Sequence, residues 1–344
     1  RSFLKSKYAI VCNSGTSALH LALLSIDIKK NDVILMPAIN FIAAYNMSLS
    51  LGAKIYLVDV DPITGQMTPE SLLKTIKQNK LNKIKAIISM YLGGSPENVY
   101  SFYKIKKKFK CKLIEDACHA FGSTYKINKK KYNIGSCSHA DISTFSFHPL
   151  KTITTGEGGA VTTNSSQIAK KIFLLRSHNL YKKNKKEYWK YNAKGIGYNY
   201  RLSDINCSLG ISQIFKVNEI IKKRSFIVNQ YKKKLLKYKN YINIPNYSKY
   251  SKSCNHLMLV SFNFQKLLTN KDKFLKFMNK NNIYPQQHYI PLFEVCNIKY
   301  TKKDFINTLN FYKNCISLPI FYSLKNKQID KVVISIEKFI KLNK

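Results

Sequence analysis

A chain of 344 residues with 45% hydrophobic residues is long enough for one large domain and a smaller one. The formal net charge of +40 is typical of proteins that bind nucleic acids, yet only four of the 58 basic residues are arginine. Because phosphate and base recognition favour arginine, we expect lysine-rich solvated surfaces and no nucleic-acid partner. A protein that binds polyanions stays an alternative.

The cysteine and hydropathy patterns narrow the class of protein further. Eight cysteines occur without a C-x-x-C pair or a zinc-type cluster with histidine, so we expect reduced thiols and no metal site. We find no run of eighteen apolar residues and no leader pattern, so we expect a cytoplasmic protein without a membrane partner. Because Arg1 stands where a methionine would begin the chain, we expect that an N-terminal segment is missing.

Short β-branched runs alternate with amphipathic helical stretches from residue 8 to about residue 164, a pattern typical of an α/β fold. One helix is predicted to begin near Thr16 and another near Pro96. Sheets of this class bind ligands beyond the carboxyl ends of their strands. The predicted strands cover residues 8–12, 33–36, 54–58, 86–90, 111–115, 142–147 and 159–163.

A long helical pattern at residues 206 to about 239 separates this region from the rest of the chain. The remainder mixes strand and helix patterns, as in an α+β unit. We therefore predict a large domain at residues 1–225 and a small domain at residues 226–344. The polar, lysine-rich segment at residues 181–194 is predicted to be a mobile loop.

A lone lysine before clustered glycines is the first candidate for chemistry. The segment at residues 145–159 has the sequence FSFHPLKTITTGEGG, which sets Ser146 five residues before Lys151 at the end of a predicted buried strand. An amine desolvated there has a lowered pKa and is a better nucleophile toward a carbonyl group. A surface lysine in a glycine-rich turn is the alternative.

The segment NSGTSA at residues 13–18 lies between a predicted apolar strand and an amphipathic helix. Its backbone N–H groups would begin that helix, a geometry that binds phosphate. Thr16 and Ser17 would lie in the first turn. An ordinary helix N-cap, where serine and threonine are common, is the alternative.

An acidic pair, Glu115 and Asp116, ends another hydrophobic strand. A carboxylate in the place of Asp116 can keep a heteroaromatic ring nitrogen protonated, so that the ring accepts electrons, and His119 could reach a neighbouring ring oxygen. The alternatives are a carboxylate at a helix N-terminus and a structural histidine.

A rare arginine lies in the sequence GYNYRLSD at residues 197–204, just before the long helix. In a chain that uses lysine almost everywhere, Arg201 beside Asn199 indicates a planar carboxylate or phosphate contact. An intramolecular ion pair with an acidic residue is the alternative.

These motifs, together with Asp59-Val60-Asp61, occur in the order and spacing that are found in a known family. From about Tyr8 to the C-terminus the chain resembles the DegT/DnrJ/EryC1/StrS sugar aminotransferases. The resemblance implies the type I fold of aspartate aminotransferase: a large α/β domain with a mostly parallel mixed sheet, then a smaller α+β domain. It also implies pyridoxal 5'-phosphate as the cofactor.

The resemblance implies a role for each motif. Lys151, Asp116 and His119 would be catalytic: the lysine binds the cofactor covalently, the aspartate pairs with its ring nitrogen, and the histidine lies beside its ring oxygen. The cofactor would also contact Thr16, Ser17 and Ser146 through its phosphate, Phe41 through ring stacking, and Asn199 of the partner subunit, while Arg201 and His288 would face substrate or the donor carboxylate. A shared site of this kind implies a homodimer.

The activity implied is transfer of an amino group from an amino acid, expected to be glutamate, to C4 of a nucleotide-linked 4-keto-6-deoxy sugar. The identity of the sugar stays open, and a GDP-perosamine-type enzyme is the rival within the family. Related 3-dehydratases carry histidine in place of the anchoring lysine, so Lys151 argues against that branch.

Overall fold

The structure is a computed structural model that describes residues 1–182, 187 and 189–343. Its central sheet has seven strands in the order β1-β9-β8-β5-β4-β2-β3. Only β9 is antiparallel to its neighbours, β1 and β8, which confirms the expected α/β class with a mostly parallel mixed sheet. The strands are β1 (Tyr8–Cys12), β2 (Val33–Pro37), β3 (Lys54–Val58), β4 (Ala86–Met90), β5 (Lys112–Asp116), β8 (Ile142–Ser146) and β9 (Gly159–Thr163).

The seven strands predicted for this region are confirmed, and no end differs by more than one residue. The signal was strong because β4 and β9 are buried at every position, so that they appear in the sequence as unbroken runs of small or apolar residues. The largest shift is in β5, which begins and ends one residue later than predicted and therefore includes Asp116.

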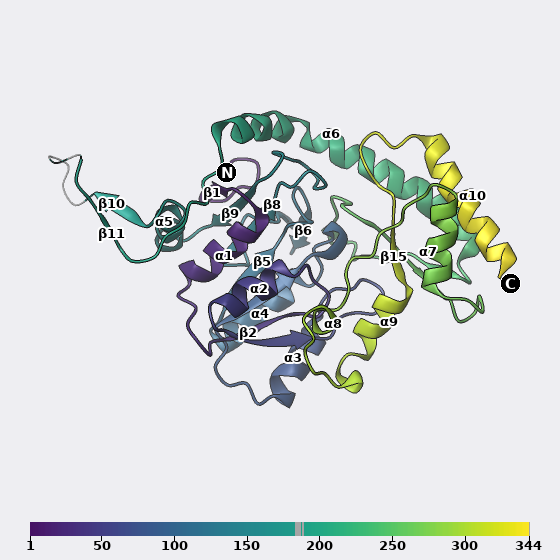
Figure 1. The fold of residues 1–344 in the computed structure, drawn as a ribbon, viewed down its shortest axis with the longest axis horizontal. Helices are drawn as coiled ribbons and strands as arrows, with labels where there is room; N and C mark the ends of the chain where they lie inside the picture. The colour runs from purple at the N-terminus through teal and green to yellow at the C-terminus, as the bar shows by residue number, and fades with distance from the viewer. Residues whose placement is uncertain (183–186, 188, 344) are drawn as a thin grey trace.

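Helices cover both faces of the sheet (Figure 1). Alternate residues of a strand point to opposite faces, and Ile114 and Leu113 accordingly belong to different apolar cores. One core is closed by α1 (Gly15–Ser25), α2 (Ala43–Ser50) and α5 (Ser166–Leu175), and the other by α3 (Pro69–Gln78) and α4 (Val99–Phe109). The helix expected near Thr16 begins at Gly15, and the one expected near Pro96 begins at Val99.

The long helix α6 (Asp204–Leu235) runs along one side of the molecule from the large sheet to the C-terminal elements (Figure 1). Its side chains Val217 and Ile221 pack in the core beside β8, whereas Ile227 and Tyr231 pack in the C-terminal core. The predicted domain boundary after residue 225 falls between these two sets and stays a prediction.

The C-terminal elements surround a small antiparallel sheet. This sheet consists of β12 (Ile242–Asn243), β14 (Met258–Phe262) and β15 (Cys315–Leu318), with α7 (Lys271–Lys280) and α10 (Asn326–Leu342) packed on it. Between β14 and β15 the chain also forms α8 (Leu292–Val295), η3 (Lys302–Asp304) and α9 (Ile306–Asn314). The remaining 3-10 turns are η1 (Leu92–Gly94) and η2 (Leu236–Tyr238).

Two small strand pairs were not predicted. A hairpin of β6 (Thr124–Ile127) and β7 (Lys130–Asn133) pairs with β13 (Ser251–Lys252). The segment predicted as a mobile loop instead has paired strands at its two ends, β10 (Leu180–Lys182) and β11 (Tyr191–Ala193), while residues 183–186 and 188 lie outside the described part. β7, β10 and β11 are short, polar and largely exposed, and only the first two residues of β6 are buried, so no burial pattern marks these strands in the sequence.

In the described part of the chain, none of the helices has the length and apolar character needed to cross a membrane. Within the same residues, no group of three or more His, Cys, Asp or Glu side chains is placed to hold a metal ion. The eight cysteines are free thiols, and five of them are buried.

Candidate active site

The candidate residues meet at the carboxyl ends of the parallel strands. Asp116 is the last residue of β5 and is in register with Thr144 of β8. Lys151 follows five residues after the end of β8, in a loop whose shape is held by backbone hydrogen bonds, including Lys151 N–H to His148 O (2.9 Å) and Thr155 N–H to Phe147 O (3.0 Å). The sheet therefore brings Lys151 toward Asp116.

Lys151 is partly buried rather than solvated. Burial lowers the pKa of its amine, and the nearby Cys118 and Asp116 raise that pKa in part. An amine with a lowered pKa is more often unprotonated at neutral pH, as a nucleophile toward a carbonyl must be. The alternative of an ordinary surface lysine is not supported by this burial.

Asp116 is 3% exposed and forms no ion pair within the described residues. Burial raises the pKa of its carboxyl group, while contacts with Cys118, the charge of Lys151 and the side chain of Asn40 lower it in part. Its Oδ1 accepts a hydrogen bond from Cys118 N–H at 3.3 Å. A buried carboxylate of this kind is suited to a cationic partner such as a protonated ring nitrogen.

His119 is 1% exposed and lies between residues from both parts of the chain. Its Nε2 is 3.0 Å from the hydroxyl of Tyr289, and its ring centroid is 4.2 Å from that of His256. Burial lowers the pKa of His119 well below its ordinary value, and the charges of Lys151, His256 and His288 add to this. His119 is therefore neutral at physiological pH.

The turn at residues 13–18 forms a narrow cradle beside β8. Ser14 caps α1 by accepting a hydrogen bond from Ser17 N–H (3.0 Å), and Ser17 donates its own hydroxyl to Asn13 Oδ1 (2.6 Å). A Cβ added to Gly15 would lie 2.7 Å from Ser146 Cβ, so the first turn of α1 packs directly against Ser146. Thr16 occupies the same turn. The segment is thus both a capped helix start and a site suited to a phosphate.

Phe41 and Asn40 extend the site from the carboxyl end of β2. The ring of Phe41 is 53% exposed and packs at 5.8 Å against Tyr289. Asn40 is buried and accepts a hydrogen bond from Phe41 N–H (2.7 Å), but its Nδ2 has no partner among the described residues. Ring stacking by Phe41 stays a prediction that this exposure allows.

Asn199 and Arg201 are exposed on either side of Tyr200, whose carbonyl accepts a hydrogen bond from Asn13 N–H at 2.9 Å. Their segment therefore lies beside the cradle of its own chain, while the two side chains are open to solvent. Arg201 forms no ion pair within the described residues, so the alternative of an intramolecular ion pair is not supported.

His288 is brought to the site from the C-terminal part of the chain. Its Nδ1 lies 2.9 Å from Ser317 Oγ, and its ring is 6.3 Å from His119. Burial, with the charge of Lys151, lowers the pKa of His288 to about 4. It is thus a neutral polar group beside Lys151 and His119.

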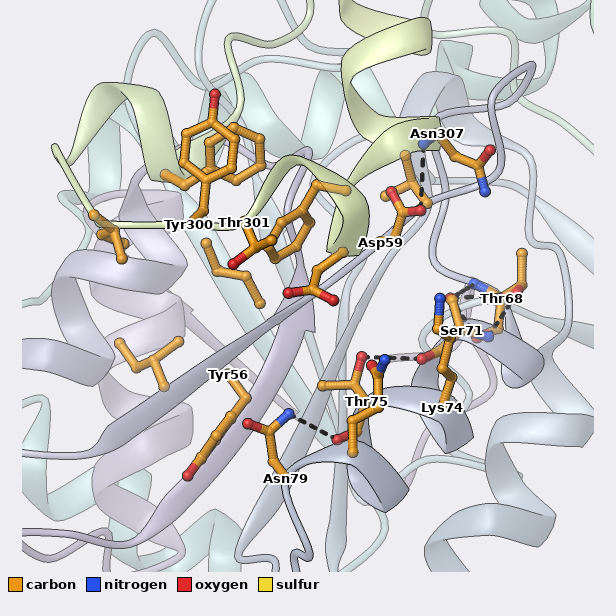
Figure 2. A pocket seen from close by; sticks show the side chains of 18 of the residues that line it. Tyr56, Asp59, Thr68, Ser71, Lys74, Thr75, Asn79, Tyr300, Thr301 and Asn307 are labelled. Atoms are coloured by element: carbon orange, nitrogen blue, oxygen red, sulfur yellow. Dashed lines mark hydrogen bonds between the residues drawn. The ribbon is translucent and has the colours of Figure 1, made fainter.

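A groove of about 970 Å³ lies elsewhere, along the open edge of β3 (Figure 2). It contains none of the predicted site residues. Asp59, at its rim, binds the start of α9 through Thr308 N–H (2.7 Å) and Thr308 Oγ1 (2.6 Å), and Thr68 caps α3. The motif Asp59-Val60-Asp61 therefore has a structural role: Asp59 fixes a helix and Asp61 a turn.

The residues fit pyridoxal phosphate on three observations. Lys151 has the lowered pKa of an amine that binds a carbonyl, Asp116 is a buried carboxylate without a bound cation, and the capped start of α1 presents its backbone N–H groups beside Ser146. The buried side chain of Asn40, which lowers the pKa of Asp116 in part, adds a polar group beside that carboxylate. A planar, phosphorylated aldehyde would meet each of these groups.

Comparison with known proteins decides the family. The model of the DegT/DnrJ/EryC1/StrS aminotransferase family matches residues 1–337. The chain belongs to this family. It is a pyridoxal-phosphate-dependent aminotransferase, so the enzyme class and cofactor expected from the sequence are confirmed.

Relatives of this aminotransferase act on sugars. A UDP-4-amino-4,6-dideoxy-N-acetyl-beta-L-altrosamine transaminase from Campylobacter jejuni is 36% identical over 327 residues, or 94% of this chain and 83% of the relative. A GDP-perosamine synthase from Caulobacter vibrioides is 30% identical over 96% of this chain and 85% of its own. The solved Helicobacter pylori PseC, an aminotransferase of pseudoaminic acid biosynthesis, has a TM-score of 0.86 at 30% identity and covers 99% of this chain and 89% of its own.

Three residues that contact the candidate site were not predicted from the sequence. His256 packs on His119, Tyr289 bonds to it, and Asn40 contacts Asp116. The three residues lie in different segments of the chain. None of them belongs to a glycine-rich or charged motif that would have marked it in the sequence. The adjacent pair His288-Tyr289 was the one available signal, but only His288 was assigned a role.

Proposed function

We propose that the enzyme transfers an amino group from glutamate to C4 of a nucleotide-linked 4-keto-6-deoxy sugar, and that the sugar is UDP-2-acetamido-2,6-dideoxy-β-L-arabino-hexos-4-ulose. The carrying observation is the grouping of Lys151, Asp116 and His119 at one sheet edge in a chain 36% identical to a transaminase of this route. Pseudaminic acid biosynthesis would be the corresponding pathway.

Each residue would contribute through its own chemistry. The bound cofactor supplies an electron-accepting ring. Lys151 would hold it covalently and, when released, carry a proton between the donor Cα and the cofactor as a general base. Asp116 would keep the ring nitrogen protonated, and neutral His119 would face the ring oxygen.

Other residues would bind the phosphate of the cofactor and the substrates. Thr16, Ser17 and Ser146 would hold the phosphate at the start of α1, where N–H groups and the helix dipole favour an anion. Arg201 offers a planar pair of donors for a carboxylate or diphosphate, and His288 a neutral donor or acceptor. The net charge of +40 would attract both anionic substrates.

The rival substrate is a GDP-linked 4-keto-6-deoxy sugar, because GDP-perosamine synthases are 30% and 32% identical to this chain. We expect the enzyme, supplied with pyridoxal phosphate and glutamate, to aminate the UDP-linked ketone at least about 100-fold faster than the GDP-linked one, as kcat/KM. Mass spectrometry of the amino sugar and assay of released 2-oxoglutarate would measure this. Preference for the GDP-linked ketone would contradict the proposed sugar while leaving the reaction intact.

A homodimer with a shared site is proposed from the apolar surface near the active site. The first turns of α6 expose Ile205 and Phe215, each 83% open, and Leu150, beside Lys151, is 74% open. Exposed apolar side chains next to a polar site are typical of an interface. The exposed side chain of Asn199 would then reach the site of the second copy.

Replacing Phe215 with glutamate tests this dimer. We expect the dissociation constant of the dimer to rise at least about 100-fold, because the substitution puts a charged carboxylate where the dimer would bury an aromatic ring. Light scattering during size-exclusion chromatography would measure the mass. Leu268→Glu is the control, because Leu268 is 87% exposed and lies between β14 and α7, outside the first turns of α6. A Phe215→Glu protein with wild-type mass would refute this interface.

A further inference from the structure

A short segment of the C-terminal part of the chain connects the small sheet to the active site. This segment, residues 286–291, is called the strap. At one end Gln286 and Ser317 of β15 exchange two backbone hydrogen bonds (2.9 and 2.8 Å). Just after the other end, Leu292 N–H donates to Ala38 O (2.9 Å), directly beyond β2. The strap is therefore anchored on both sides of the site.

Tyr289 is the strap residue that contacts the cofactor-facing groups. Its hydroxyl lies 3.0 Å from His119 Nε2. Its ring packs at 5.8 Å against Phe41 and at 6.0 Å against His119. One side chain thus touches both the predicted stacking residue and the predicted neighbour of the ring oxygen.

The hydrogen bond to Tyr289 holds the imidazole of His119 in place. Nδ1 of His119 is buried and has no partner among the described residues, and it is the ring of His256 that packs beside it. Nε2 therefore makes the one hydrogen bond of the imidazole that the described residues provide. Burial raises the pKa of Tyr289, so its phenol keeps its proton, and His119 is neutral.

We propose that Tyr289 is a positioning residue that acts through His119: its hydroxyl fixes the orientation of the imidazole that faces the ring oxygen of the cofactor. The inference rests on the proposed role of His119. It also connects the small sheet to the reaction, because a movement of the strap would move Tyr289 and, with it, His119.

The test is Tyr289→Phe, which removes the hydroxyl and keeps the ring against Phe41. A donor on the ring oxygen withdraws electron density from the nitrogen that links Lys151 to the cofactor and weakens its hold on a proton. We expect the pH midpoint of the absorbance of the bound cofactor to rise by about half to one unit. We also expect kcat to fall about 10-fold with little change in the KM of glutamate.

Tyr125→Phe is the matched control, because Tyr125 forms the same kind of bond with His139 Nδ1 (2.7 Å) outside the site. Its midpoint should equal that of the wild type. In a His119→Ala background the further change Tyr289→Phe should move the midpoint no more, because the two residues act as one unit. An unchanged midpoint in Tyr289→Phe, or additive shifts in the double variant, would overturn the inference. Failure of the wild-type enzyme to bind the cofactor would overturn the proposed function and this inference with it.

Discussion

Lys151→Ala is expected to lower kcat/KM for transamination at least about 10⁴-fold, the largest effect that we predict for a single substitution. In the proposed mechanism the amine is both the covalent anchor and the general base, so alanine would remove two functions at once. Treatment with borohydride followed by peptide mass spectrometry should find the cofactor attached to the wild-type peptide and absent from that of the variant.

Two further variants distinguish the loss of covalent cofactor binding from the loss of the positive charge at residue 151. Lys151→Arg keeps a cation beside Asp116 but cannot bind a carbonyl covalently, and it should be as inactive as alanine. Lys170→Ala changes an exposed lysine of α5 and should leave activity and trapping unchanged. Cofactor trapped on the Lys151→Ala protein would show that another lysine is the anchor.

The central sheet could be predicted because most residues of its inner strands are buried. Short apolar runs between polar turns are typical of buried strands. Ile87 with Ile88 and Leu113 with Ile114 form two such runs. The short, mostly polar hairpin of β6 and β7 gives no comparable signal. Its third strand, β13, pairs with β6 from more than a hundred residues further along the chain.

The candidate site was predictable only where a motif is local. Ser146 and Lys151 lie close together in the sequence at the end of β8, and Asp116 and His119 at the end of β5, so their spacing carried information. His256 and Tyr289 come to His119 through the packing of the small sheet on the large one, which no periodicity records. Contacts between distant segments depend on tertiary structure, and the sequence of either segment alone does not contain them.

The electrostatics of the site follow from burial more than from charge pairing. Burial is the largest cause of the pKa shifts of Lys151, Asp116, His119 and His288, and it disfavours the charged form of each group. The cofactor would bring a cationic ring nitrogen to Asp116 and a phosphate to the start of α1. The carboxylate of Asp116 and the N–H groups at the start of α1 would thus gain partners of opposite charge from the cofactor. Cofactor binding should therefore stabilise the fold.

Asp116→Asn is expected to retain the cofactor on Lys151 but to lower kcat about 100-fold or more, because asparagine cannot keep the ring nitrogen protonated. Single-turnover absorbance with glutamate would measure the loss. Glu115→Gln is the matched control: Glu115 is the neighbouring buried carboxylate, but it is bound to Tyr91 Oη (2.9 Å) and to Ser143. That variant should keep its turnover.

Asp116→Asn should not destabilise the cofactor-free protein. Because burial raises the pKa of Asp116, the folded state binds a proton at this group more tightly than the unfolded state does. Ionised Asp116 therefore costs stability, and the cost grows as pH rises above its unfolded value of about 3.9. We expect Asp116→Asn to melt at or above the wild-type temperature at pH 7, with the difference shrinking toward pH 4. Lower stability together with full turnover would place the partner of the ring nitrogen elsewhere and give Asp116 a structural role.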